Sequence, residues 1–139
     1  MTKHKIKLNL QIVLIILLCI ILATYGYSYF TNGCNPAKAN IFGYKLVYIG
    51  SESMEPTINT GALVLCKMLT SPEEIAVGDI CNYLYTTSSG TQKSIIHRII
   101  KLSDDNTYIF KGDNNPKADY LPVSADQICS KYIFTLYNP

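Results

Sequence analysis

The stretch Asp79–Leu102, DICNYLYTTSSGTQKSIIHRIIKL, decides how the larger part of this chain folds. It contains two runs rich in aromatic and β-branched residues, Asp79–Tyr85 and Ser94–Leu102, on either side of the polar segment Thr86–Gln92. Runs of this length and composition favour strands, and a polar segment with Ser and Gly is typical of a loop. We therefore predict two strands joined by a loop.

Further runs of the same character lie on both sides of this stretch, separated by turn-forming residues. We predict strands at Tyr44–Ile49, Ala62–Cys66, Thr107–Phe110 and Ile128–Leu136. Ser71, followed by Pro72 and two glutamates, indicates one short helix that Gly78 ends. Short strands with so little helix predict a mainly β domain, either a small barrel or a sandwich.

The N-terminal run Leu8–Phe30 has no charged side chain. At about 1.5 Å per residue, a helix of this length crosses a hydrocarbon core of roughly 30 Å. Lysines precede the run and aromatic residues end it, which places the N-terminus in the cytoplasm and the following domain outside the plasma membrane. A cleaved secretory signal and a lipid-modified Cys34 are the competing interpretations. The run is longer than a typical signal h-region, and no small-x-small pair follows it closely.

Three parts follow from this pattern: a basic tip and single transmembrane helix at 1–30, a juxtamembrane linker at 31–43, and the β domain at 44–139. The chain has 12 basic and 10 acidic residues, and no acidic residue precedes Glu52. Three of the basic residues are Lys3, Lys5 and Lys7, so the rest of the chain is close to neutral. This distribution favours the lipid bilayer as a partner and gives no sign of a nucleic-acid-binding face.

The chain has five cysteines, of which Cys19 lies inside the apolar run. The other four, Cys34, Cys66, Cys81 and Cys129, would lie outside the cytoplasm, where one or two disulfides are allowed but cannot be paired from spacing. None of them has the spacing of zinc ligands, so we expect no metal. No nucleotide-binding motif is present, and we expect no cofactor.

Two serines, Ser51 and Ser53, follow the first predicted strand. In an extended chain this spacing projects both hydroxyls to the same side. Pro56 restricts the residue before it to extended conformations, so the segment after Ser53 should be stiff. Taken alone, such a pair is more often a solvated turn or a helix cap.

Other chemistry-bearing residues lie further along the chain. His97 is expected on a strand face with Ile95 and Ile99, a setting in which histidine is more often a core residue than a catalyst. Asp113 and Asp119 lie on one turn-rich segment. A serine hydroxyl becomes a good nucleophile when a base accepts its proton and a carboxylate orients that base, and the chain supplies all three types of residue.

The ordered motifs SESMEPT, GALVLCK, VGDI, IIHRI and KGDNN, with an aspartate six residues after that of KGDNN, resemble those of type I signal peptidases. The resemblance runs from about Tyr44 to Ile128. Most bacterial members carry lysine as general base, whereas His97 at that motif resembles the archaeal and endoplasmic-reticulum branch, which some Gram-positive bacteria also carry.

This resemblance implies Ser53 as nucleophile, His97 as general base, Asp119 as triad acid and Asp113 in a supporting role. It also implies an oxyanion hole from Ser51 and the backbone N–H of Ser53. The implied activity is that of a membrane-bound serine endopeptidase, signal peptidase I, which cleaves N-terminal signal peptides from exported preproteins after small residues.

Two rival interpretations remain open at this point. One is a catalytically inactive, membrane-anchored binding or assembly protein on the same fold, and the other is a self-cleaving regulator of the related Ser-Lys group. The sequence does not reveal the preproteins cut, a general or dedicated role, the oligomeric state, any partner subunit, or how Asp113 and Asp119 divide their work.

Overall fold

The computed structural model describes residues 2–33, 35–36, 38–71, 74–103 and 105–139, with residues 2–8 described as helix backbone. The chain forms two compact units, Met1–Phe42 and Gly43–Pro139. Each unit has its own architecture, and the second carries all the candidate site residues named above.

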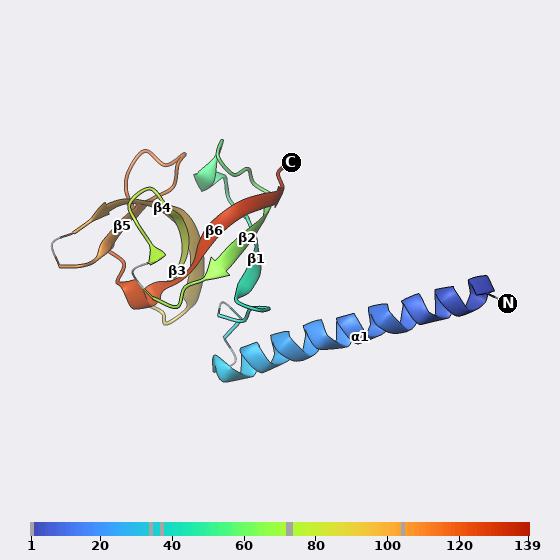
Figure 1. Ribbon diagram of the computed structural model, residues 1–139. Coiled ribbons are helices and arrows are strands. Elements are labelled where there is room, and N and C mark those ends of the chain that lie inside the picture. The colour runs from blue at the N-terminus through green and yellow to red at the C-terminus, as the bar shows by residue number, and fades with distance from the viewer. Residues whose placement is uncertain (1, 34, 37, 72–73, 104) are drawn as a thin grey trace. The chain divides into compact units, whose positions relative to one another are not determined.

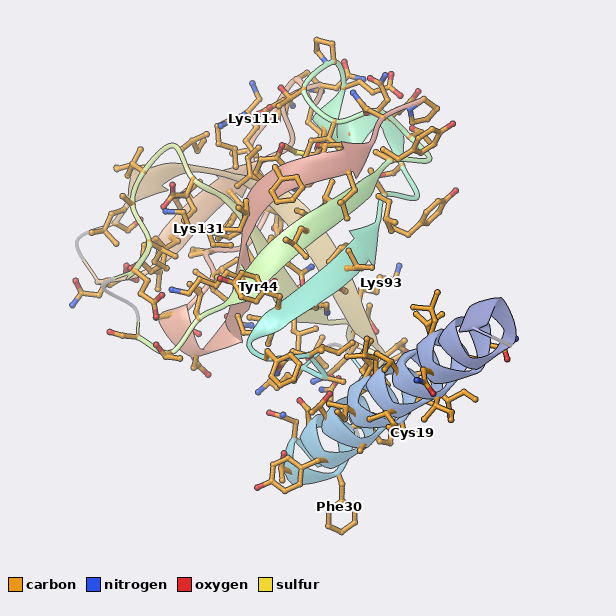
Figure 2. The ribbon with its side chains drawn as sticks, turned by 45° about the vertical axis from the view of Figure 1, so that its right-hand side comes forward. Cys19, Phe30, Tyr44, Lys93, Lys111 and Lys131 are labelled. Atoms are coloured by element: carbon orange, nitrogen blue, oxygen red, sulfur yellow. The ribbon has the colours of Figure 1, made fainter. Side chains whose placement is uncertain are left out.

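The first unit is dominated by one helix, α1 (Thr2–Thr31). Its segment Asn9–Thr31 has a mean hydropathy of 2.4 and is long and apolar enough to cross a membrane. The side chains of Cys19 and Phe30 project outward from the helix (Figure 2). A helix that is apolar on every side is suited to a lipid environment, as predicted for this part of the chain.

The second unit is a single six-stranded sheet in which all neighbouring strands are antiparallel. Its strands are β1 (Tyr44–Tyr48), β2 (Leu63–Met68), β3 (Ile80–Thr86), β4 (Gln92–Leu102), β5 (Tyr108–Lys111) and β6 (Ile128–Tyr137). The order across the sheet is β1-β2-β6-β3-β4-β5, so the C-terminal strand β6 lies between β2 and β3 (Figure 1).

The predicted strands are confirmed within one or two residues at each end. The mainly β class with one N-terminal helix is also confirmed. Where a barrel or a sandwich was predicted, the structure has one six-stranded sheet with β1 and β5 at its edges. The predicted helix from Ser71 falls partly on Pro72 and Glu73, which lie outside the described residues, and its extension to Gly78 is wrong because residues 75–79 are not helical.

Apolar side chains pack on both faces of the sheet, because successive residues of a strand point to opposite sides. On β3, Ile80 belongs to one buried cluster with Met54, and Cys81 belongs to another with Phe110. Five consecutive residues of β3, from Ile80 to Leu84, are buried. This strand is therefore the centre of the domain, and β4 beside it is held in a fixed register.

Candidate active site

The serine turn begins with Ser51 in an extended conformation and continues as a short 3-10 helix, Glu52–Met54. Ser53 therefore lies in a tight turn and not in an extended chain. The hydroxyls of the two serines nevertheless meet, since the two Oγ atoms are 3.1 Å apart. Met54 is fully buried and anchors the turn in the domain, while Glu55 is extended before Pro56, as predicted.

The segment after β5 packs directly on this turn. The backbone N–H of Asn114 donates to the carbonyl of Ser53 at 2.9 Å, and its side-chain amide donates to the carbonyl of Glu52 at 3.1 Å. Gly112 lies so close that a Cβ there would be 2.5 Å from the Ser53 carbonyl oxygen and 2.9 Å from Nε2 of His97. Glycine at this position allows the two segments to meet.

His97 lies in the middle of β4, opposite Cys81 of β3, and is only 8% exposed. Its Nε2 is 3.0 Å from Oγ of Ser53, and its Nδ1 is 2.7 Å from Oδ2 of Asp119. An ionised carboxylate can only accept hydrogen bonds, so Nδ1 of the neutral ring donates and Nε2 is left to accept the Ser53 proton. The three side chains therefore form a hydrogen-bonded chain of the nucleophile, base and acid type.

Asp119 is held in place by its backbone, because its N–H donates to the carbonyl of Phe110 at 2.8 Å. Burial alone would raise the pKa of its carboxyl. Hydrogen bonds from His97 and Tyr83 outweigh that effect and hold the pKa below its ordinary value. Asp119 is therefore ionised at neutral pH and can stabilise a protonated imidazole.

Asp113 has a different neighbour. Its carboxylate accepts two hydrogen bonds from Arg98, from Nε at 2.9 Å and from Nη2 at 2.7 Å. The guanidinium holds the pKa of Asp113 below its ordinary value, against the opposing effect of burial. The bidentate pair ties the segment after β5 to β4. Arg98 also donates to the carbonyl of Gly78 at 2.8 Å, which ties the segment before β3 to the same strand. The structure brings Asp113 close to the other candidates, but as the partner of Arg98.

A cavity of about 500 Å³ opens beside the two serines. Val47, Ile49, Ser94, Ile95 and Ile96 lie along its wall, and Asn82 is part of its lining. Strand β5 pairs with β4 only from Arg98 onward, so in the part of the chain that the structure describes no third strand pairs with the first half of β4. The site therefore combines a serine hydroxyl hydrogen-bonded to an imidazole, a mostly apolar hollow and, from Ser94 to Ile96, a strand edge that no third strand covers.

Lysines are placed elsewhere. Lys93 and Lys101 flank His97 on β4 and are exposed, and the hydrogen bonds described for Ser53 Oγ lead to Ser51 and His97. Figure 2 shows Lys93, Lys111 and Lys131 at separate places on the domain. The geometry thus favours the imidazole as the partner of Ser53.

The structure also describes three of the cysteines outside the N-terminal helix and the side chains that could bind a metal ion. Cys66 and Cys81 are buried free thiols, Cys129 is also buried, and Cys34 lies outside the described residues. Burial raises the pKa of Cys66 to about 11 and that of Cys81 to about 12. Within the described ranges, no group of three or more His, Cys, Asp or Glu side chains is arranged to hold a metal ion.

Sequence reasoning missed four contributors to the site: Tyr83, Arg98, Gly112 and Asn114. Gly112 and Asn114 lie inside the KGDNN motif. The motif therefore drew attention to these positions, but it did not indicate what the two residues do. Arg98 directly follows His97, but its pairing with Asp113 depends on strand register. Tyr83 gave no signal of its own, because a tyrosine in a strand is ordinary.

Comparison with known proteins gives an informative match. The chain is similar to Signal peptidase I W of Bacillus subtilis (strain 168), with 34% identity over 131 residues. The alignment covers 92% of this chain, and the chain spans 65% of the length of that relative. No protein-family model matches the chain.

Proposed function

We infer that this chain belongs to the type I signal peptidase family, and we propose that it is a membrane-anchored serine endopeptidase that removes N-terminal signal peptides from exported preproteins. The observation that carries the proposal is the hydrogen-bonded chain from Asp119 through His97 to Ser53, at distances of 2.7 and 3.0 Å. The similarity to a signal peptidase I over 92% of the chain points to the same activity.

In the proposed reaction, Oγ of Ser53 attacks the carbonyl carbon of the scissile bond while its proton moves to Nε2 of His97. Asp119 stabilises the imidazolium that forms. His97 then gives the proton to the leaving amine, and the signal peptide stays attached to Ser53 as an acyl ester. A water molecule deprotonated by His97 attacks the ester and restores the free hydroxyl.

The negative oxygen of the tetrahedral intermediate needs hydrogen-bond donors. We assign this role to the Ser51 hydroxyl and to the backbone N–H of Ser53. The Oγ atoms of the two serines are 3.1 Å apart, so a carbonyl carbon within reach of Ser53 places its oxygen near Ser51. An N–H near the start of a helix has no acceptor within the helix, which leaves it available for an oxyanion.

The substrate would bind as an extended strand along the free edge of β4, with small side chains in the cavity beside the serines. Backbone pairing gives affinity in this mode, and pockets for alternate side chains give selectivity. The mostly apolar lining, with Ile49 and Ile96 among its members, suits small residues such as alanine at the positions before the cut.

We further propose that α1 anchors the protein in the cytoplasmic membrane with its N-terminus inside and the β domain outside. The segment Asn9–Thr31 has the required length and hydropathy. The apolar segment of a signal peptide lies in the same bilayer. Tethering therefore confines the enzyme and the cleavage site to one surface layer, which raises their effective concentration.

Processing of a reporter preprotein by the full-length chain in detergent or in cells tests the proposal. Ser53→Ala and His97→Ala should each leave the preprotein uncleaved. The matched control Lys101→Ala changes an exposed residue in the part of the same strand that pairs with β5, and it should cleave the preprotein normally. Normal cleavage by Ser53→Ala would contradict the proposed nucleophile. A cellular phenotype of the chain that persists in Ser53→Ala would favour an inactive binding or assembly protein, and fragmentation of the purified chain alone would favour the self-cleaving regulator.

A further inference from the structure

One buried hydroxyl reaches the site from the centre of the sheet. Tyr83 lies on β3 and is 4% exposed, and its Oη donates to Oδ2 of Asp119 at 2.7 Å. The same carboxylate oxygen accepts Nδ1 of His97, also at 2.7 Å. We propose that Tyr83 is a positioning residue of the catalytic site, which fixes the Asp119 carboxylate against His97 and keeps it ionised; this inference rests on the proposed function.

The sheet register explains why Tyr83 can reach that oxygen. Cys81 and Tyr83 lie opposite His97 and Ile95 on the adjacent strand. Residues two apart on a strand share a face, and cross-strand partners do so too, so Tyr83 and His97 are diagonal neighbours on one side of the sheet. Both side chains therefore converge on a carboxylate that lies above that side.

The tyrosine ring is itself immobilised. It packs against Phe110 with ring centroids 4.6 Å apart, and the carbonyl of Phe110 accepts the backbone N–H of Asp119. The tyrosine ring and the backbone of Asp119 are thus both held by the same residue of β5. This rigid support is what a hydroxyl needs in order to hold an acceptor in one orientation.

The hydroxyl also has an electrostatic effect. Asp119 is largely buried, with a side-chain exposure of 15%, and burial disfavours its charged form. The donors that offset this effect are His97 and Tyr83. When His97 accepts the Ser53 proton, the carboxylate must stay ionised and aimed at Nδ1, and Tyr83 supplies a donor that does not change during the reaction.

Tyr83 remains a donor throughout the working pH range. Burial, then the hydrogen bond to Asp119 and the negative charge of that carboxylate, raise the pKa of Tyr83 above the ordinary value for tyrosine. Among the other titratable groups nearby, Tyr85 acts on Tyr83, and Asp113 interacts electrostatically with His97 and is paired with Arg98. The thiol of Cys81 lies opposite His97 on the adjacent strand.

Both Tyr83 and Tyr85 line a second cavity, of about 430 Å³, on the Asp119 side of the imidazole. Tyr85 shares the strand face of Tyr83 and lies outside the hydrogen-bond chain of the site. It therefore offers a matched control, because Tyr85→Phe also removes a tyrosine hydroxyl from this cavity but leaves the hydrogen bonds of Asp119 intact.

Two measurements test the inference on full-length protein in detergent micelles. Tyr83→Phe should lower kcat for reporter cleavage by roughly tenfold with KM little changed, since a hydrogen bond to a charged group is lost while the ring packing stays. In carbon-13 spectra of protein labelled at aspartate carboxyls, with Asp119→Asn to assign the signal, Asp119 should titrate about one pH unit higher in Tyr83→Phe. Tyr85→Phe should change neither quantity.

An unchanged titration of Asp119 in Tyr83→Phe would overturn the inference. A kcat of Tyr83→Phe equal to that of the wild type would also overturn it. If Tyr83→Phe does not fold, 3-fluorotyrosine placed at position 83 makes the hydroxyl a stronger donor, and Asp119 must then titrate at lower pH; no shift would also overturn it. The titration needs no activity. Failure of the wild-type chain to cleave any preprotein would therefore count against the proposed function separately.

Discussion

Replacing Gly112 by alanine tests whether the close packing around Ser53 is needed for activity. The added Cβ would lie 2.5 Å from the Ser53 carbonyl oxygen, 2.7 Å from Nδ2 of Asn115 and 2.9 Å from Nε2 of His97. Carbon and oxygen atoms approach no closer than roughly 3.3 Å even in favourable contacts, so the serine turn must retreat by about 0.8 Å. The Gly112 φ lies outside the left-handed region, so the change acts through this steric contact alone.

A displacement of about 1 Å at a reacting group costs on the order of 100-fold in rate, and we expect a loss of that size for Gly112→Ala. The assay is the initial rate of preprotein cleavage by purified full-length chain, with a thermal melt of each variant to confirm that it is folded. Gly26→Ala in α1 is the control, because a Cβ there meets no atom within 4 Å. A Gly112→Ala enzyme within about twofold of wild type would refute the reasoning.

Three further predictions concern stability and reactivity. Asp113→Asn should lower the free energy of unfolding by about 1–3 kcal/mol in chemical denaturation, because it weakens the bidentate pair with Arg98. The lowered pKa of Asp119 adds stability that is present above the unfolded pKa of about 3.9 and is lost as pH falls through the folded pKa. The acid limb of the melting temperature should therefore be shallower in Asp119→Asn, and an identical limb would contradict that assignment. The thiols of Cys66 and Cys81, with pKa values of about 11 and 12, should resist alkylation at pH 8 until denaturant is added, as mass spectrometry of labelled protein would show.

The sequence predicted most of the secondary structure because the signals were local. Runs such as Asp79–Tyr85 carry strand-forming residues between turn formers, and Leu8–Phe30 is apolar over the length of a membrane span. The prediction that failed was the extension of a helix from Ser71 to Gly78. The conformation of these residues depends on the packing around them, which overrides the short pattern in the sequence.

The sequence by itself determined the apolar N-terminal helix, the strands and the candidate residues Ser51, Ser53, His97, Asp113 and Asp119. Only the tertiary structure decided their partners. The strand order β1-β2-β6-β3-β4-β5 sets the register in which Ser53 meets a histidine 44 residues later, and Asp119 meets both His97 and Tyr83. The physical reason is that hydrogen bonds between residues so far apart require a fixed sheet register and buried side chains, and neither is visible in a one-dimensional pattern.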